Sequence, residues 1–431
     1  MKLVPTRFLN GALLGLLTAS IAAACGSDEA KKTVRPSEGG AGGQAGGVQA
    51  RGGDRALPEP AGGAGHPAPM AGGEGGMAPT LGGEGGATLV AMGGAPSPSA
   101  GAAGSPDELP PVDCDPVVFA DAQLENAIRT AIDKAGPLTA QDIASLTSLD
   151  ARGYGIATLD GIECFTELTN VDLGIGGQSS NVADLSPLRY LKKLVTLSLN
   201  VNPIESLDAL AQLPALQRLD LNSVTDGLDL TPLGSAPSLS VLHLESDNVA
   251  DLTPLGKSSS LKELWLTNST LAVPNSLSKL TSVKLLYLSG AQLTDATPLA
   301  SLKQLTELNI DGNGNLTNFN KLSTLTNLTW LDAGYTGISS ITAVASMTKL
   351  KTLYLYFDQI ADISPLQGLT QLESLALNFN PVTDITPLVN NAGLGTGDTI
   401  NLAGTSLSCP AQGANVTTLV GRGATVYSPC N

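Results

Sequence analysis

The chain has 431 residues, of which 39 are acidic and 23 are basic, so its formal net charge is −16 at pH 7. This balance argues against a phosphate backbone as partner and excludes nucleic-acid binding. The two histidines, His66 and His243, belong to no nucleophile elbow, phosphate loop or metal-ligand spacing. The sequence therefore predicts no catalytic site, no metal and no cofactor.

Residues 1–24 are typical of a secretory signal peptide. Lys2 and Arg7 precede an apolar run at residues 13–24, which is too short to span a bilayer as a mature helix. The sequence IAAAC, which ends at Cys25, resembles a bacterial lipobox. The resemblance implies cleavage before Cys25, a thioether-linked lipid and acylation of the new amino group, with palmitate as an expected acyl chain. An ordinary signal peptide followed by an unrelated cysteine is the alternative.

Residues 25–111 carry this cysteine and then a Gly/Ala/Pro-rich segment with stretches such as AGGAG and LGGEGG. Gly26, where an aspartate would resemble an inner-membrane retention signal, favours the outer membrane or the cell surface. Several acyl chains would anchor the protein stably. The segment has almost no apolar side chains that could form a core, so we expect a disordered tether with an r.m.s. span of roughly 50 Å. Collagen is the competing interpretation, but the glycines come in doublets without a strict third-residue period.

A helical cap is expected at residues 112–148, where the composition changes. Leu124, Ile128 and Ile132 fall at helical spacing, which predicts an amphipathic helix within 119–132.

A second short helix should begin after Thr139. Thr139 and Asp142 resemble a capping box in which aspartate replaces glutamate. Together the two helices should cover Leu149 and Ile156, because the first unit of a repeat array otherwise exposes its apolar end.

Residues 149–408 contain an internal repeat of about 22 residues, which is most regular in the last two copies. Leu353 and Leu355 recur as Leu375 and Leu377, and a period of this length indicates a solenoid. The first apolar residue of each copy is Leu149, Val171, Leu197, Leu219, Leu242, Leu264, Leu286, Leu308, Leu331, Leu353, Leu375 or Ile400.

The pattern LxxLxLxxNxIxDIxPLxxL is met almost completely at residues 350–369 and 372–388. These residues resemble the leucine-rich repeats of the bacterial, internalin-like 22-residue class, and the resemblance covers about 119–431. It implies an α/β solenoid: an arc with parallel strands on its concave face, 3₁₀ turns on its convex face and an N-terminal helical cap. It also implies protein recognition or adhesion.

Two positions in each repeat should shape its turns. The residue five after the first leucine is polar in several copies, and its side chain can satisfy buried backbone groups. These residues are Asn202, Asp247, Asn313, Asp358 and Asn380, whereas Val224 and Ala291 are apolar and predict weaker turns. In the return segments, as at residues 362–366, we expect Ser or Thr to cap a 3₁₀ turn and Pro to take its first position.

Four cysteines remain once Cys25 is assigned to the lipid, and an exported compartment permits disulfides. Of three pairings, we favour Cys114 with Cys164 in the N-terminal cap and Cys409 with Cys430 in a C-terminal cap at residues 409–431. A four-cysteine zinc site is the alternative, but the two pairs belong to opposite ends of the solenoid.

The side chains between and beside the strand leucines should face outward on the concave side. Both tryptophans and three of the seven tyrosines fall there, and Trp and Tyr are usual interface anchors. The expected partner-binding residues are His243, Trp265, Tyr287, Asn309, Trp330, Asp332, Tyr354 and Tyr356. The alternative is that large side chains simply pack against cross-strand neighbours.

The sequence thus favours a non-catalytic, surface-displayed module that recognises a protein partner through its concave face. The alternative is a structural envelope protein that binds cell-wall glycan or associates with itself. An enzyme is the third class, because Asp220, Glu245 and Glu263 could do acid–base work. We expect these carboxylates to be solvated on an open face, without the burial that tunes a catalytic group.

Overall fold

The structure is a computed structural model that describes residues 109–174 and 180–430. The predicted signal peptide, Cys25 and nearly all of the predicted tether lie outside the described residues. The described part holds the N-terminal cap, the repeats and the C-terminal cap.

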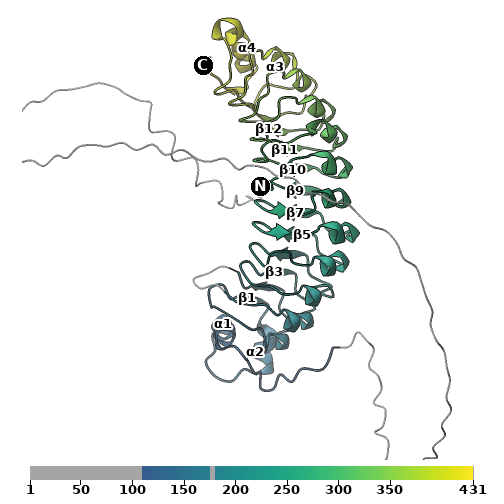
Figure 1. Cartoon of the computed structure of the whole chain (residues 1–431). Helices are drawn as coiled ribbons and strands as arrows, with labels where there is room; N and C mark the ends of the chain where they lie inside the picture. The colour runs from purple at the N-terminus through teal and green to yellow at the C-terminus, as the bar shows by residue number, and fades with distance from the viewer. Residues whose placement is uncertain (1–108, 175–179, 431) are drawn as a thin grey trace, which may run out of the picture. The chain divides into compact units, whose positions relative to one another are not determined.

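A parallel sheet lines one side of the solenoid and short helical turns line the other, as predicted (Figure 1). All twelve expected strands are present, and a thirteenth, β15, follows them. Neighbouring strands pair in register, so that Leu331 lies beside Leu353 and Leu353 beside Leu375. The strands of the main sheet are β1 (Ser148–Asp150), β2 (Asn170–Asp172), β3 (Thr196–Ser198), β4 (Arg218–Asp220), β5 (Val241–His243), β7 (Glu263–Trp265), β9 (Leu285–Tyr287), β10 (Glu307–Asn309), β11 (Trp330–Asp332), β12 (Thr352–Tyr354), β13 (Ser374–Ala376), β14 (Thr399–Asn401) and β15 (Thr425–Tyr427).

The convex side consists of single helical turns, because a 22-residue repeat leaves no room for longer helices. They are η1 (Ile162–Cys164), η2 (Ser186–Tyr190), η3 (Asp208–Leu210), η4 (Thr231–Ser235), η5 (Thr253–Lys257), η6 (Pro274–Lys279), η7 (Thr297–Ser301), η8 (Phe319–Thr324), η9 (Thr342–Ser346), η10 (Ser364–Leu366) and the α-helical turn α3 (Thr386–Asn390). A second small sheet, which the sequence did not reveal, pairs β6 (Asn248–Val249) with β8 (Thr270–Leu271).

The predicted capping of these turns was wrong in detail. In η10 the side chain of Ser364 does not cap the turn, and proline is its second residue. Instead, Asp362 accepts a hydrogen bond from the backbone N–H of Ser364 at 2.8 Å. Asp384 does the same for Thr386 at 2.8 Å. The carboxylate two residues upstream therefore satisfies the first free amide of the turn.

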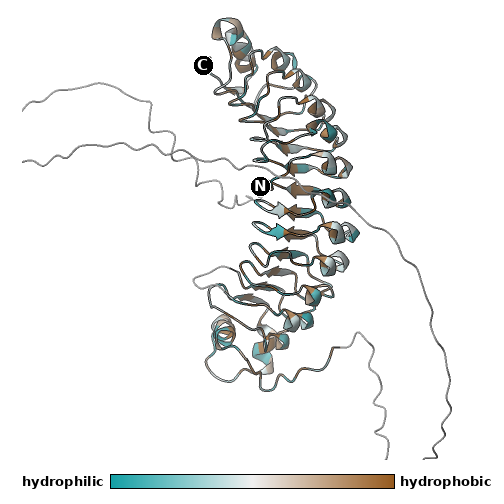
Figure 2. Cartoon of the chain, in the orientation of Figure 1, coloured by the Kyte–Doolittle hydropathy of each residue, from teal (hydrophilic) through white to brown (hydrophobic). Residues whose placement is uncertain are grey.

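Leucines from the strands and the turns fill the space between the two sides, and hydrophobic residues recur in every repeat (Figure 2). At the N-terminal end, α1 (Ala122–Ile132) and α2 (Ala140–Ser145) form the predicted cap, and Leu149 and Ile156 are buried. The expected capping box of Thr139 and Asp142 is present.

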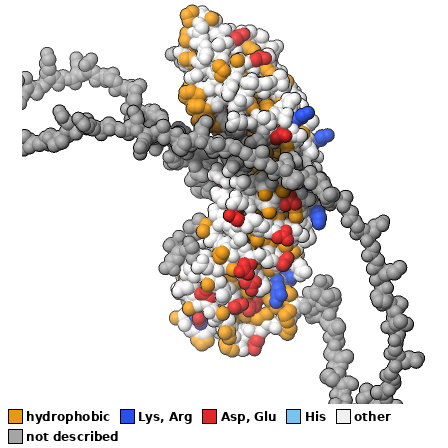
Figure 3. All heavy atoms as spheres, viewed as in Figure 1, with side chains coloured by type: hydrophobic (Ala, Val, Ile, Leu, Met, Phe, Trp, Pro, Cys, Tyr) orange, Lys and Arg blue, Asp and Glu red, His pale blue; other side chains and the backbone are white. Residues whose placement is uncertain are grey.

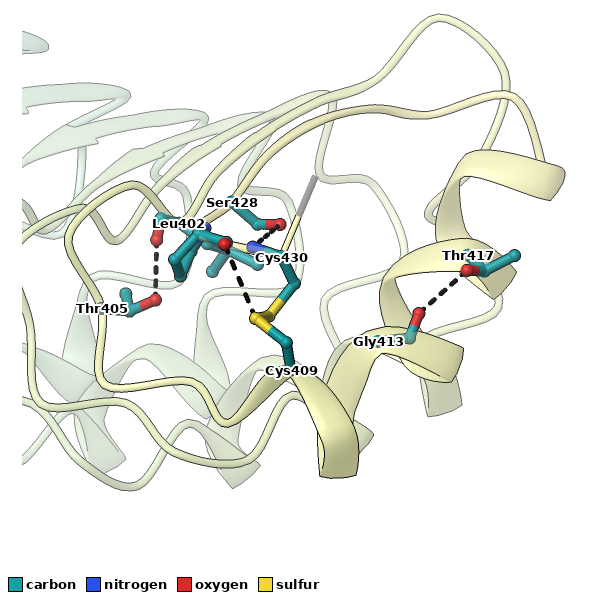
Figure 4. The surroundings of a disulfide bond; sticks show 8 residues. Leu402, Thr405, Cys409, Gly413, Thr417, Ser428 and Cys430 are labelled. Atoms are coloured by element: carbon teal, nitrogen blue, oxygen red, sulfur yellow. Dashed lines mark hydrogen bonds between the residues drawn. A yellow bond between two sulfur atoms is a disulfide. The ribbon is translucent and has the colours of Figure 1, made fainter.

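Disulfides close both ends of the solenoid with the predicted pairing. Cys114 is joined to Cys164 in the N-terminal cap. At the other end, Cys409 begins α4 (Cys409–Gly421) and is joined to Cys430, just beyond β15 (Figure 4). The strand β15 pairs with β14 and extends the sheet by one strand.

Buried polar side chains run through the turns that come after the strands. Asn380 accepts from the N–H of Ile360 at 2.9 Å and donates to the carbonyl oxygens of Leu355 and Leu377 at 2.6 and 3.1 Å. Asn202 and Asn313 make the corresponding three bonds. These three asparagines thus satisfy buried backbone groups as predicted.

Candidate partner-binding face

Five rings form a continuous row across the concave face from β5 to β12, which we call the aromatic row: His243, Trp265, Tyr287, Trp330 and Tyr354. Consecutive ring centroids are 5.1, 3.9, 6.4 and 6.2 Å apart. The strand register explains the first part, because His243 pairs with Trp265 and Trp265 with Tyr287. Aromatic pairs at such separations add about 0.5–1.5 kcal/mol each beyond burial, so the row is a fixed surface.

Carboxylates accept hydrogen bonds from the polar groups of two of these rings. The indole N–H of Trp265 donates to Glu263 at 2.7 Å, and the hydroxyl of Tyr287 donates to Glu307 at 2.8 Å. Hydrogen bonds to charged groups are stronger than neutral ones, so the orientation of both rings is well defined. Each glutamate uses one carboxylate oxygen for this contact.

Tyr356 anchors a second carboxylate cluster at the C-terminal side of the row. Its hydroxyl donates to Asp311 at 3.1 Å and to Asp332 at 3.3 Å. Its ring lies over Gly334, where a Cβ atom would come within 2.6 Å of the ring. Only glycine at this position lets Tyr356 reach both aspartates.

Asp332, which contacts Tyr356, is buried, with 8% of its surface exposed. Burial raises the pKa of Asp332 to about 7, and the nearby Asp311 and Asp358 charges add to the rise. Tyr356 and the N–H of Gly334 donate to the carboxylate and oppose it. Asp332 therefore supports Tyr356 and is not itself available to a partner in this conformation.

The N-terminal half of the face carries Asp150, Asp172 and Asp220. Acidic side chains are also prominent over the N-terminal part of the solenoid in Figure 3. Its two inward-facing arginines are both paired with aspartates. Arg152 contacts Asp150 at 2.6 Å and Arg218 contacts Asp220 at 3.0 Å. An open hollow of about 350 Å³ lies over β1–β4 and is lined by Asp150, Asp172 and Asp220 among others.

The expectation that the carboxylates here are solvated was wrong for Asp220. Its side chain is 14% exposed, because Arg218 and the His243 ring lie against it at 3.0 and 3.3 Å. Burial raises the pKa of Asp220, although the positive charge of Arg218 opposes the rise. Burial and the Arg218 charge lower the pKa of His243 to about 4, so His243 is neutral at pH 7. Burial also raises the pKa of Glu245.

A second set of aromatic side chains, absent from the predicted list, lies in the turns after β11, β12 and β13. We call it the edge column: Tyr335, Phe357 and Phe379. The rings are stacked at 4.5 and 4.2 Å and are 48, 41 and 50% exposed. All three residues have positive φ, between 51° and 58°. Bulky residues seldom adopt this conformation, which costs roughly 1–2 kcal/mol each.

The repeat alignment contained a signal for the edge column. In the five copies before the column, the fourth residue after the first leucine is Ser223, Ser246, Asn268, Gly290 or Gly312, all small residues with positive φ, and in the copy at Leu197 it is Val201, also with positive φ. The change to aromatic residues in three consecutive copies breaks this pattern. An aligned position that changes from small to aromatic is evidence of a surface function, since a turn alone does not require it.

Of the eight residues predicted to bind a partner, five make up the aromatic row. Tyr356 lies beside it and contacts Tyr335 of the edge column at 5.6 Å between ring centroids. Asn309 accepts from the N–H of Asp311 at 2.9 Å, in the strand between Tyr287 and Trp330. Within residues 109–174 and 180–430, no group of three or more His, Cys, Asp or Glu side chains could hold a metal ion. Nor does any helix of the described part have the length and apolar character needed to cross a bilayer.

Comparison with known proteins agrees with this geometry. A family model of two leucine-rich repeats matches residues 326–368 and 350–390. The crystal structure of an internalin (inlF) from Listeria monocytogenes is 30% identical, with a TM-score of 0.55, and the match covers 71% of this chain and 95% of the internalin. A leucine-rich repeat protein of Leptospira interrogans has the same fold at 23% identity and a TM-score of 0.52, over 67% of this chain and 79% of that one. No curated protein matches.

The parallel ladder, the 3₁₀ turns and the buried polar position of each repeat define a leucine-rich repeat solenoid. The identity to the Listeria protein extends over nearly all of that protein. The chain therefore belongs to the internalin-like leucine-rich repeat proteins.

Proposed function

We propose that this protein is a non-catalytic binding module that recognises a protein partner through the aromatic row, in adhesion or another cell-surface interaction. The observation that carries the proposal is the row itself. Four Trp and Tyr rings gather beside His243 on one face of a chain in which Phe, Trp and Tyr together make up only 3% of the residues. Clusters of Trp and Tyr on a rigid surface are the usual anchors of protein interfaces.

The rigidity of the face supports this function. Glu263 and Glu307 fix two of the rings, and the rings are packed against one another. A surface that is ordered before binding loses little conformational entropy when a partner docks, which favours affinity. Cross-strand packing alone would account for stacked rings, but it would not require the hydrogen-bonded glutamates that orient them.

Surface display through a lipid on Cys25 is part of the same proposal. The predicted signal peptide and lipobox would deliver the chain to the outer membrane or cell surface. The predicted tether would then let the solenoid reach partners away from the bilayer. Metabolic labelling with an alkyne-bearing fatty acid tests this arm, with Cys25→Ser as the variant that should lose the label.

Photo-crosslinking on intact cells tests the recognition itself. A photoreactive residue placed at position 265 or 354 should capture one recurrent protein, identified by mass spectrometry. The same group at position 323, in the convex turn η8, is the matched control and should not capture that protein. Combined replacement of Trp265, Tyr287 and Tyr354 by Ser should abolish binding to the captured partner.

Two other outcomes would count against the proposal. Capture of only other copies of the chain would indicate self-association, and capture of wall fragments would indicate a structural role on glycan. The stacking of Trp265 on Tyr287 at 3.9 Å already covers one face of each ring, which leaves less ring surface for a sugar.

A further inference from the structure

The strands that carry the aromatic row present negative charge and no positive charge on the concave face. From β7 to β12, the inward-facing positions hold four carboxylates, Glu263, Glu307, Asp311 and Asp332, and neither lysine nor arginine. Asp311 and Asp332 both accept hydrogen bonds from the hydroxyl of Tyr356. Glu263 and Glu307 are the two carboxylates of this face that remain accessible to a partner.

The nearest lysines do not neutralise these glutamates. Lys262 donates to the carbonyl oxygens of Ser259 and Ser282 at 2.5 and 3.5 Å, at the edge where the strands begin. Lys351 forms an ion pair with Glu373 at 2.6 Å on the same edge. Lys284 is exposed at that edge, before the first residue of β9.

Each of the two glutamates has one carboxylate oxygen engaged by a ring of the aromatic row. Oε1 of Glu263 accepts from Trp265, and Oε2 of Glu307 accepts from Tyr287. Neither glutamate forms an ion pair with a lysine or arginine of the described residues. A carboxylate beside aromatic rings suits a guanidinium or ammonium group, which can bond the oxygen and lie against the rings.

We propose that Glu263 and Glu307 receive arginine or lysine side chains of the protein partner, so that its contact segment is basic. The inference rests on the proposed function, and it names the chemistry of the partner at that same face. β7 and β10 are two strand spacings apart, so the basic groups should be separated by about 10 Å. The acidic hollow over β1–β4 extends the same complementarity toward the N-terminal end.

The test uses the full-length chain as bait for random 12-residue peptides displayed on phage. The selected pool should be enriched in arginine and lysine. A selected peptide in which citrulline replaces arginine should bind more weakly, because citrulline keeps the shape and loses the charge. Binding of the parent peptide should also weaken as salt increases.

Variants of the chain then locate the contact. Glu263→Gln and Glu307→Gln should each weaken the basic peptide about tenfold, because a hydrogen bond to a charged group is lost. Glutamine still accepts from Trp265 or Tyr287 through its amide oxygen, so the ring positions are kept. The matched control is Glu373→Gln, which removes a carboxylate outside the row and should leave binding unchanged.

The outcomes separate this inference from the proposed function. Neutral or acidic peptides that need Trp265, Tyr287 and Tyr354 but tolerate both glutamine variants would overturn the inference and keep the proposed function. Basic peptides that bind the glutamine variants as tightly as the parent chain would also overturn it. Peptides that bind equally well after replacement of Trp265, Tyr287 and Tyr354 would contradict both the inference and the proposed function.

Discussion

Asp358 and Asn380 occupy equivalent positions in adjacent turns, 22 residues apart, but only Asn380 can donate a hydrogen bond in its ordinary form. Oδ1 of Asp358 accepts from the N–H groups of Thr336 and Gly337 at 2.9 and 2.7 Å. Oδ1 of Asn380 accepts likewise from Ile360. The other oxygen of Asp358 is buried and has no partner, where Asn380 has the amide that donates to two carbonyl groups.

This difference predicts that Asp358→Asn stabilises the fold at neutral pH. Burial raises the pKa of Asp358 to about 6, and its ordinary value is 3.8. The folded state therefore binds the proton more tightly than the unfolded state. The contribution of protonated Asp358 to the free energy of unfolding is at its maximum below pH 4 and is lost as the pH rises through 6. Asparagine avoids this loss and supplies the missing donor. We expect a gain of about 1–3 kcal/mol at pH 8, measured by urea unfolding.

The pH series is the internal control for that variant. At pH 4 the aspartic acid is protonated in the folded state and nearly half protonated in the unfolded state, so the difference between variant and parent should shrink. Asp247, whose second oxygen is also buried without a partner and whose pKa burial raises to about 6, should behave in the same way. A gain that is the same at pH 4 and pH 8 would contradict the explanation.

Gly334→Ala should destabilise the protein and displace Tyr356. The new methyl group would come within 2.6 Å of the Tyr356 ring. The displaced hydroxyl of Tyr356 could then no longer donate to both Asp311 and Asp332. We expect a loss of about 1–3 kcal/mol and a further rise in the pKa of Asp332, which carboxyl NMR titration can follow. Gly314→Ala is the matched control, since nothing lies within 4 Å of the added atom.

Removal of the C-terminal disulfide should weaken the last repeat. The bridge from Cys409 to Cys430 closes a loop with a sequence separation of 21. Chain entropy predicts a loss of roughly 3 kcal/mol for the double replacement by serine. Hydrogen exchange should show faster opening of β14 and β15 than of β11, and equal protection of the three strands in the variant would contradict this.

The edge column predicts a separation of stability from function. Phe357→Asn removes a bulky residue from the positive-φ region but also removes two stacking contacts, at 4.5 and 4.2 Å. These effects oppose each other, so the change in stability should stay within about 1 kcal/mol. Binding to the partner captured by crosslinking should nevertheless fall, because the variant loses an exposed ring from the surface. Leu355→Asn, at a fully buried position, is the contrast and should unfold the chain.

The repeat was readable in the sequence because each structural feature of the fold recurs at a fixed offset. The buried apolar residues of the twelve main-sheet strands before β15, the buried polar residue of the turn and the 3₁₀ segments could all be inferred from the 22-residue period. The cap helices could be inferred from helical spacing and from the Thr139 and Asp142 pair. These features depend on local backbone chemistry that each copy repeats.

The features that could not be predicted depend on contacts between copies. The burial of Asp332 requires Tyr356 from the next copy, and the burial of Asp220 requires His243 from the next strand. The capping aspartates could not be told from the Ser and Thr residues beside them, because both types cap helices. The strand β15 lies outside the repeat and forms because the disulfide-linked C-terminal cap brings it to β14.

The two disulfides change where the solenoid would first come apart. An array of repeats held by nearest-neighbour contacts ordinarily loosens from its ends. Here a disulfide closes each end, so local unfolding should begin inside the array. We expect it at Val224 or Ala291, where the turn lacks its polar side chain. Limited proteolysis should therefore release two long fragments, each still closed at its outer end, and not a series of shortened chains.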